Sequence, residues 1–155
     1  MSGRFEKRLA ELGIALAPAP AAVANYVPFV RSGNLVFVSG QLPLKDGKLA
    51  FAGKLGAELG VEEGAAAARL CAINIIAQAK AACDGDLDRL RRVVKITGFV
   101  ASTPDFINQP KVINGASDLL VEVFGDVGRH ARAAVGAPSL PLDAAVEIEA
   151  VLEIQ

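Results

Sequence analysis

The sequence predicts an α+β fold in which two helices pack on one face of a mixed β-sheet. Residues 146–154 alternate apolar residues with glutamates, as a strand with one buried face does. Between residues 61 and 124, two segments instead repeat apolar residues at helical spacing. Stretches rich in β-branched residues precede, separate and follow these segments. The order is hairpin, helix, strand, helix, strand, strand, which favours two helices layered on one side of a sheet.

The N-terminal segment predicts a short amphipathic helix and an extended connector. Phe5, Leu9 and Leu12 recur at helical spacing, so we expect a peripheral helix over residues 3–12 that Gly13 ends. Prolines among the alanines of residues 15–24 disfavour helix there. Residues 1–23 therefore form the extension of one domain, 1–155, because this length suffices for a single core.

The first half of the domain predicts a hairpin, loops and a long helix. Residues 26–31 and 35–39 read as strands around a turn at 32–34. Residues 46–60 are expected to form loops with one short strand. The segment 61–82 predicts a helix that ends near Gly85, and its expected packing stripe is Ala66, Leu70, Ile73 and Ala77.

The second half predicts a buried central strand, a helix and two further strands. Residues 92–100 carry apolar side chains on both faces, which is typical of a central strand. Thr103 and Pro104 suit a helix start, Pro110 is expected to delay or kink the first turn, and Gly125 suits the stop. Residues 131–135 and 146–154 complete the sheet. The apolar stripe of this helix is Ile113, Ala116, Leu120 and Phe124.

Composition excludes several functional classes. Sixteen basic and seventeen acidic residues give a net charge of −1, which argues against nucleic-acid binding. Cys71 and Cys83 lack a second pair with metal-ligand spacing, so both are expected to be free thiols in the core, and no metal or cofactor is expected. Metalloprotease, phosphate-loop, dinucleotide-binding and serine-hydrolase motifs are absent. Neither a signal peptide nor a membrane span is evident, so cytoplasm is the expected location.

A sheet covered by helices on one side leaves its other face open. The last strand would present apolar and acidic residues on opposite faces. We therefore expect a closed oligomer that covers the second face.

Arg132 is the candidate functional residue that the pattern itself singles out. It lies inside a short apolar strand, where a guanidinium is costly to bury unless an anion meets it, and its planar fork matches a carboxylate. From the residues alone, a salt bridge to one of the protein's own glutamates, at the surface or at a subunit interface, is the simpler explanation, because charged pairs in strands are usually structural. For neighbouring His130, a capping or partly exposed position is the simplest role.

The joint order of several short motifs resembles the Rid, or YjgF-type, family, also known as endoribonuclease L-PSP. The resemblance covers roughly residues 24 to 154. It rests on Tyr26 before the hairpin, Val38-Ser39-Gly40-Gln41-Leu42-Pro43, Val94-Lys95-Ile96 to Phe99-Val100, Asn114 in a helix, Arg132-Ala133-Ala134-Val135, Leu140-Pro141 and Val146-Glu147-Ile148-Glu149.

This resemblance implies a chorismate-mutase-like fold of the bacillary type, assembled as a homotrimer with active sites in clefts between subunits. Deaminase members hydrolyse 2-aminoacrylate and related enamines or imines, including 2-iminopropanoate, without a cofactor. By motif match Arg132 would bind the substrate carboxylate and Glu147 would position or activate water. The remaining implied pocket residues are Tyr26, Ser39, Gly40, Asn114, Ala133 and Ala134, with His130 as a further candidate.

Two departures from the family pattern affect the expected chemistry. Where many members carry proline and cysteine around the arginine, this chain has His130 and Ala134, so a cysteine-dependent mechanism is not expected.

Tyr26 suits an interfacial aromatic as well as a catalytic role, and Gly40 suits a strand end as well as a ligand contact. A trimer that binds small carboxylates or 2-oxoacids without turnover is the alternative function, and an endoribonuclease is a third. Neither a membrane nor a nucleic-acid partner is expected.

Overall fold

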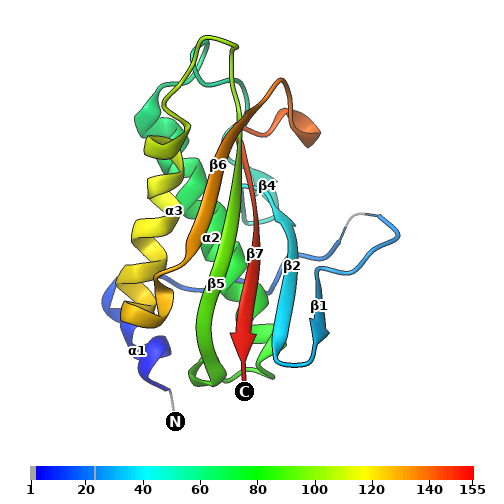
Figure 1. Ribbon diagram of the computed structural model, residues 1–155, viewed down its shortest axis with the longest axis vertical. Coiled ribbons are helices and arrows are strands. Elements are labelled where there is room, and N and C mark those ends of the chain that lie inside the picture. The colour runs from blue at the N-terminus through cyan, green and yellow to red at the C-terminus, as the bar shows by residue number, and fades with distance from the viewer. Residues whose placement is uncertain (1–2, 23) are drawn as a thin grey trace.

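A computed structural model describes residues 3–22 and 24–155, and it has the predicted layers (Figure 1). Five strands form one mixed sheet in the order β1-β2-β7-β5-β6, and a small second hairpin pairs β3 with β4. The helices are α1 (Arg4–Glu11), α2 (Val61–Ala82) and α3 (Gln109–Phe124), with short 3₁₀ turns η1 (Leu87–Arg89), η2 (Gly125–Gly128) and η3 (Pro141–Asp143). The strands are β1 (Phe29–Ser32), β2 (Leu35–Gln41), β3 (Leu44–Lys45), β4 (Lys48–Leu49), β5 (Leu90–Ala101), β6 (Ala131–Ala137) and β7 (Val146–Ile154).

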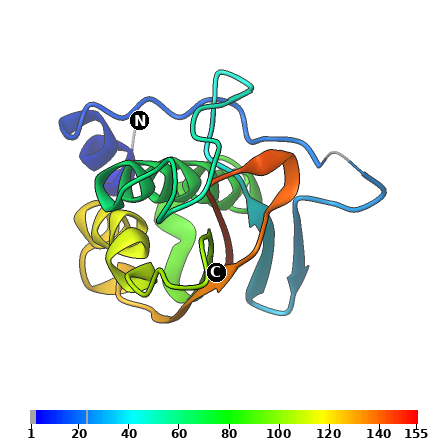
Figure 2. The ribbon, with the colours of Figure 1, turned by 90° about the horizontal axis from the view of Figure 1, so that it is seen from above.

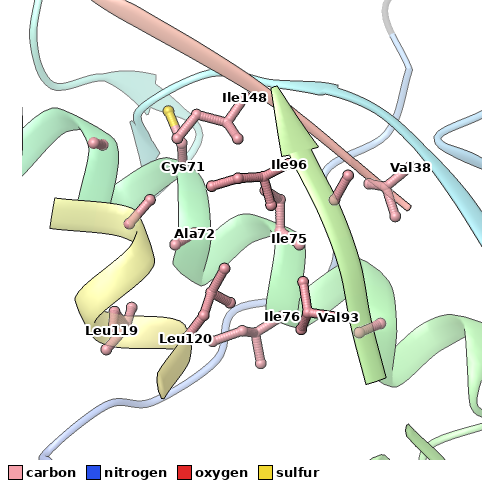
Figure 3. Close-up of a cluster of buried hydrophobic side chains, with 14 of the residues drawn as sticks. Val38, Cys71, Ala72, Ile75, Ile76, Val93, Ile96, Leu119, Leu120 and Ile148 are labelled. Carbon is pink, nitrogen blue, oxygen red and sulfur yellow. The ribbon is translucent and has the colours of Figure 1, made fainter. Parts of the chain in front are cut away.

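The long helices α2 and α3 lie side by side on one face of the large sheet (Figure 2). Their close approach depends on small residues, since a Cβ at Gly115 would lie 2.0 Å from the carbonyl oxygen of Ala65. Between helices and sheet, apolar side chains from both layers interdigitate (Figure 3). Ile75 and Ile76 of α2, Leu119 and Leu120 of α3, Val93 and Ile96 of β5, and Ile148 of β7 all belong to this core.

The sheet is antiparallel except for one pair of strands. β7 pairs with β2 on one side and with β5 on the other, and β6 runs parallel to β5 at the edge. Burial alternates along β7 as predicted, with Val146, Ile148 and Ala150 buried against the helices. The glutamates of β7 therefore lie on the face that carries no helix.

Several expectations about the elements were wrong. The N-terminal helix is not peripheral, because Phe5 and Leu9 are buried and the Phe5 ring meets Phe124 edge to face at 4.9 Å. Thr103 and Pro104 form a turn, closed by a hydrogen bond from the Phe106 amide to the Thr103 carbonyl. α3 starts only at Gln109, so Pro110 occupies the first turn, where its missing N–H leaves no helical bond unmade.

A further error concerns the packing face of α2. Of the expected stripe, Ala77 is buried, but Ala66 is exposed and Leu70 and Ile73 are half-buried, whereas the residues fully buried against the sheet and α3 lie one position away. α2 is apolar around most of its circumference, so alanine spacing alone does not indicate which face packs inward. The stripe that packs inward is Gly64, Ala67, Ala68, Cys71, Ala72, Ile75, Ile76 and Ala79.

The face of the sheet opposite the helices carries exposed apolar residues. Phe37 is 46% exposed, and its register partners Val30 and Val151 share its face. β5 was expected to be buried on both faces, but Thr97 and Phe99 on this side are only half-buried within one protomer. Val135 of β6 pairs with Phe99 and extends the same surface.

Candidate functional site

Four of the predicted site residues line one pocket of about 430 Å³. Tyr26 precedes β1, Ser39 and Gly40 lie near the end of β2, and Glu147 lies at the start of β7. The pocket wall is largely apolar, which suits a ligand with a hydrocarbon part. Its other lining residues are Pro20, Ala21, Ala22, Pro28, Gln41, Leu42, Leu44, Pro141 and Leu142.

An irregularity in β2 shapes this pocket. The pairing of β2 with β7 shifts register between Val38 and Gln41, so Ser39 and Gly40 leave the regular ladder. The Ser39 hydroxyl donates a hydrogen bond to the Val27 carbonyl at 2.8 Å, and the Ser39 amide donates to the Pro28 carbonyl at 2.9 Å. Ser39 therefore anchors the segment that carries Tyr26.

Glu147 lies directly over Gly40. A Cβ added to Gly40 would lie 1.9 Å from Oε2 of Glu147, so glycine is what allows the carboxyl group to occupy this place. Burial raises the pKa of Glu147, and the Glu149 carboxylate raises that pKa further. Among the residues that the structure describes, no cation lies within 4 Å of the Glu147 carboxyl group. A carboxyl group with a raised pKa suits general acid–base work near neutral pH.

A second group of predicted residues lies around Arg132 on β6. Arg132 pairs with Ile96, whose side chain is buried beneath the helices, so the guanidinium also points to the helix side. Its Nη2 donates to the Pro110 carbonyl at 3.3 Å and its Nη1 donates to Ser117 Oγ at 3.2 Å. Asn114 lies between these two contacts on the same face of α3, by helical spacing.

The partners of Arg132 are neutral. In the described part of the chain, no carboxylate lies within 4 Å of the guanidinium, which is partly buried. The salt bridge considered for Arg132 is therefore not formed within this protomer. Ala133 pairs with Thr97 and Ala134 with Gly98, so Ala134 follows Arg132 on the helix side and Ala133 faces the other way.

His130 joins the Arg132 group through a residue that sequence reasoning missed. The imidazole Nε2 lies 2.8 Å from Ser117 Oγ, and Nδ1 lies 2.7 Å from the Gly128 carbonyl oxygen. Ser117 contacts both His130 and Arg132. In the sequence, the only indication for Ser117 was that it follows Asn114 by three residues on one face of the expected helix. Such spacing alone does not assign a role to a serine.

The structure does not bring the two groups together within one protomer. β5 separates β7 from β6, so the two strands lie about 10 Å apart across the sheet. Glu147 pairs with Phe99 on the open face, whereas Arg132 pairs with Ile96 on the helix face. Tyr26, Ser39, Gly40 and Glu147 form one half of the predicted site, and the Arg132 group forms another.

Cys71 lies in the core behind the Glu147 half, with its thiol 3.7 Å from the Val146 carbonyl oxygen. Burial raises the pKa of this thiol and the Glu147 carboxylate raises that pKa further, which disfavours a nucleophilic thiolate. Within residues 3–22 and 24–155, no three His, Cys, Asp or Glu side chains are grouped as metal ligands would be. None of the helices described is long and apolar enough to cross a membrane.

Comparison with known proteins identifies the family. Residues 6–153 match the family model described as "YjgF/chorismate_mutase-like, putative endoribonuclease". The chain belongs to the YjgF family. The chorismate-mutase-like fold and the Rid resemblance predicted from the motifs are thereby confirmed.

Three similar proteins match most of the chain. Protein TCP17 of Trypanosoma cruzi is 53% identical over 154 residues, which cover 99% of this chain and 96% of that protein. The crystal structure of Atu1372 from Agrobacterium tumefaciens is 56% identical with a TM-score of 0.92, covering 97% of this chain and 92% of that one. Escherichia coli TdcF, crystallised with bound serine, is 26% identical with a TM-score of 0.62, covering 88% and 94%.

Proposed function

We propose that this chain is an enzyme that hydrolyses reactive enamines or imines such as 2-aminoacrylate. The observation that carries the proposal is the partly buried Arg132 guanidinium, whose described partners are a hydroxyl and a carbonyl oxygen. A guanidinium without a carboxylate partner is suited to bind one from a ligand. The serine bound to TdcF, which carries a carboxylate, is consistent with this ligand class.

The proposed reaction needs positioning and proton transfer. An enamine such as 2-aminoacrylate first gains a proton at its methylene carbon and loses one from nitrogen, which gives the imine. Arg132 holds the substrate carboxylate, and Glu147 orients a water molecule toward the carbon of the C=N bond. Addition of that water and loss of ammonia give a 2-oxoacid. Glu147 accepts a proton from the water and returns it to the leaving nitrogen, and its raised pKa supports such work. Tyr26, Ser39, Gly40, Asn114, Ala133 and Ala134 would border the substrate.

The proposal includes a homotrimer, because the two halves of the site need different copies to meet. The exposed apolar face around Phe37, Leu35 and Val135 supports an association of this kind. A cleft between subunits would place the Arg132 group of one copy against the Glu147 pocket of the next. A cytoplasmic location is part of the same proposal.

Ammonia release from freshly generated 2-aminoacrylate tests the activity. Arg132→Ala should lower kcat/KM by roughly a hundredfold or more, since it removes the charge that holds the substrate. Arg129→Ala is the matched control, because Arg129 is exposed and pairs with Asp126 at 3.4 Å. An Arg132→Ala enzyme as active as the Arg129→Ala enzyme would refute the anchor.

Mixing two inactive variants tests the composite site. Arg132→Ala and Glu147→Gln chains, unfolded together and reassembled in equal amounts, should regain about a quarter of wild-type activity. A working site needs an intact Arg132 from one chain and an intact Glu147 from the neighbouring chain. In a random mixture each of these is present in half of the sites, so both are present in about a quarter of them. If both residues act within one protomer, the mixture stays inactive.

A binding protein without turnover is the second candidate, favoured by the serine bound to TdcF. Calorimetry that detects pyruvate binding, in a protein that releases no ammonia from 2-aminoacrylate, would support it. The family description also names an endoribonuclease. Cleavage of single-stranded RNA that persists through purification and disappears in Arg132→Ala would support that activity instead.

A further inference from the structure

A chain of hydrogen bonds runs from Arg132 to the backbone at Gly128. The Gly128 carbonyl can only accept, so Nδ1 of His130 carries the proton of that 2.7 Å bond. Arg132 can only donate, so Ser117 Oγ accepts from Nη1 at 3.2 Å. Ser117 Oγ lies 2.8 Å from Nε2 of His130, and it donates to this nitrogen when the ring carries its proton on Nδ1 alone. The two ends of the chain thus fix the direction of the outer bonds, and this tautomer directs the inner bond from Ser117 to His130.

We propose that Ser117 and His130 are positioning residues that hold the Arg132 guanidinium ready for a ligand carboxylate. This inference rests on the proposed function, since it assigns a role to two residues behind the same anion site. Neither residue needs to touch the ligand. Ser117 fixes one edge of the guanidinium, and His130 fixes the rotation of the Ser117 hydroxyl.

The physical reason lies in the length of the arginine side chain. An unrestrained guanidinium samples many rotamers, and binding an anion then requires it to lose that freedom. The bond that Nη1 donates to Ser117 Oγ, together with the bond that Nη2 donates to the Pro110 carbonyl at 3.3 Å, removes much of that freedom in advance. Acceptors without charge restrain the group and leave its positive charge available, whereas a carboxylate would neutralise it.

No charged group from the surrounding elements replaces this arrangement. On the 3₁₀ turn η2 and just after it, Asp126 and Arg129 pair with each other. On β5, Lys95 pairs with Ala131, one position before Arg132, so it belongs to the opposite face of the sheet. Across the described residues, no carboxylate lies within 4 Å of the His130 imidazole.

Calorimetric binding of pyruvate, used as the carboxylate probe on the assembled protein, tests the proposal. Ser117→Ala and His130→Asn should each raise the dissociation constant for pyruvate roughly tenfold, because each breaks a hydrogen bond that restrains the Arg132 guanidinium. Ser117→Thr keeps the hydroxyl and His130→Gln keeps an acceptor for it, so both should stay within about threefold of wild type. Melting curves verify that the four variants fold.

Nuclear magnetic resonance adds a readout that a purely structural role would not change. His130 is the only histidine, so its imidazole signals are assigned without ambiguity. Pyruvate should shift these signals in wild type and leave them unchanged in Arg132→Ala.

Wild-type affinity in both Ser117→Ala and His130→Asn overturns the inference and leaves the Arg132 anchor intact. Loss of affinity in Ser117→Thr and His130→Gln equal to that of the disruptive variants also overturns it. If wild type itself does not bind pyruvate, the inference and the proposed carboxylate anchor fail together.

Discussion

Replacing Gly40 by alanine should abolish the proposed deaminase activity without unfolding the protein. The added Cβ would lie 1.9 Å from Oε2 and 2.8 Å from Cδ of Glu147, whereas ordinary contacts begin near 3.4 Å. The carboxyl group must therefore move by at least about 1.5 Å, and a displacement of this size in a catalytic group lowers the rate by roughly a hundredfold. Gly40 does not need a left-handed backbone, and the flexible end of Glu147 can rotate away, so the fold tolerates the methyl group.

The assay is kcat/KM for ammonia release, with thermal melting measured in parallel. Gly60→Ala is the matched control, since its Cβ would meet only Glu63 Oε1 at 3.6 Å. The double variant Gly40→Ala with Glu147→Gln should be no slower than Glu147→Gln alone, because both changes act on one carboxyl group. Undiminished activity in Gly40→Ala, or an additional loss in the double variant, would refute the reasoning.

Three further predictions concern stability and assembly. The pKa of Glu147 is higher in the folded protein than in the unfolded chain, so ionisation of this carboxyl group destabilises the fold. At mildly alkaline pH, Glu147→Gln should therefore melt at a higher temperature than wild type. The difference in melting temperature should disappear as the pH falls through the raised pKa toward the ordinary value of 4.5. Gly115→Ala should lower the unfolding free energy by about 2 kcal/mol in urea titrations, because its Cβ would press on the backbone of Ala65. Phe37→Asp should shift the mass measured by light scattering from that of the proposed trimer to that of a monomer, since it places a charge on the exposed apolar face; an unchanged mass would contradict the proposed interface.

Strand and helix identity followed from the sequence wherever a single physical cause dominated. β7 alternates because one face packs on the helices, and its bounds match the predicted 146–154. α2 likewise spans the predicted 61–82. The errors arose where two causes competed: Thr103 and Pro104 serve a turn as well as a helix start, and an alanine-rich helix has no distinctive packing face.

The site could be predicted only through resemblance. Arg132 alone could be predicted as a candidate from its own chemistry, since a guanidinium in an apolar strand needs a partner. Nothing in the residue pattern showed that Glu147 would lie against Gly40, because a register irregularity in β2 sets that contact. Ser117 was missed for a related reason: its contacts with Arg132 and His130 depend on how α3 packs against β6.

The proposed chemistry and the proposed assembly share one structural cause. In β6 the side chains alternate between faces, so Arg132 is placed toward α3 while Val135 is placed on the open face. The same alternation in β7 places Glu147 on the open face and Ile148 in the core. A register slip of one residue in β7 would exchange its two faces, burying the Glu147 carboxyl group and exposing Ile148 at once. The packing that stabilises each protomer therefore also fixes that Glu147 and Val135 lie on the open face and that the Arg132 guanidinium lies against α3.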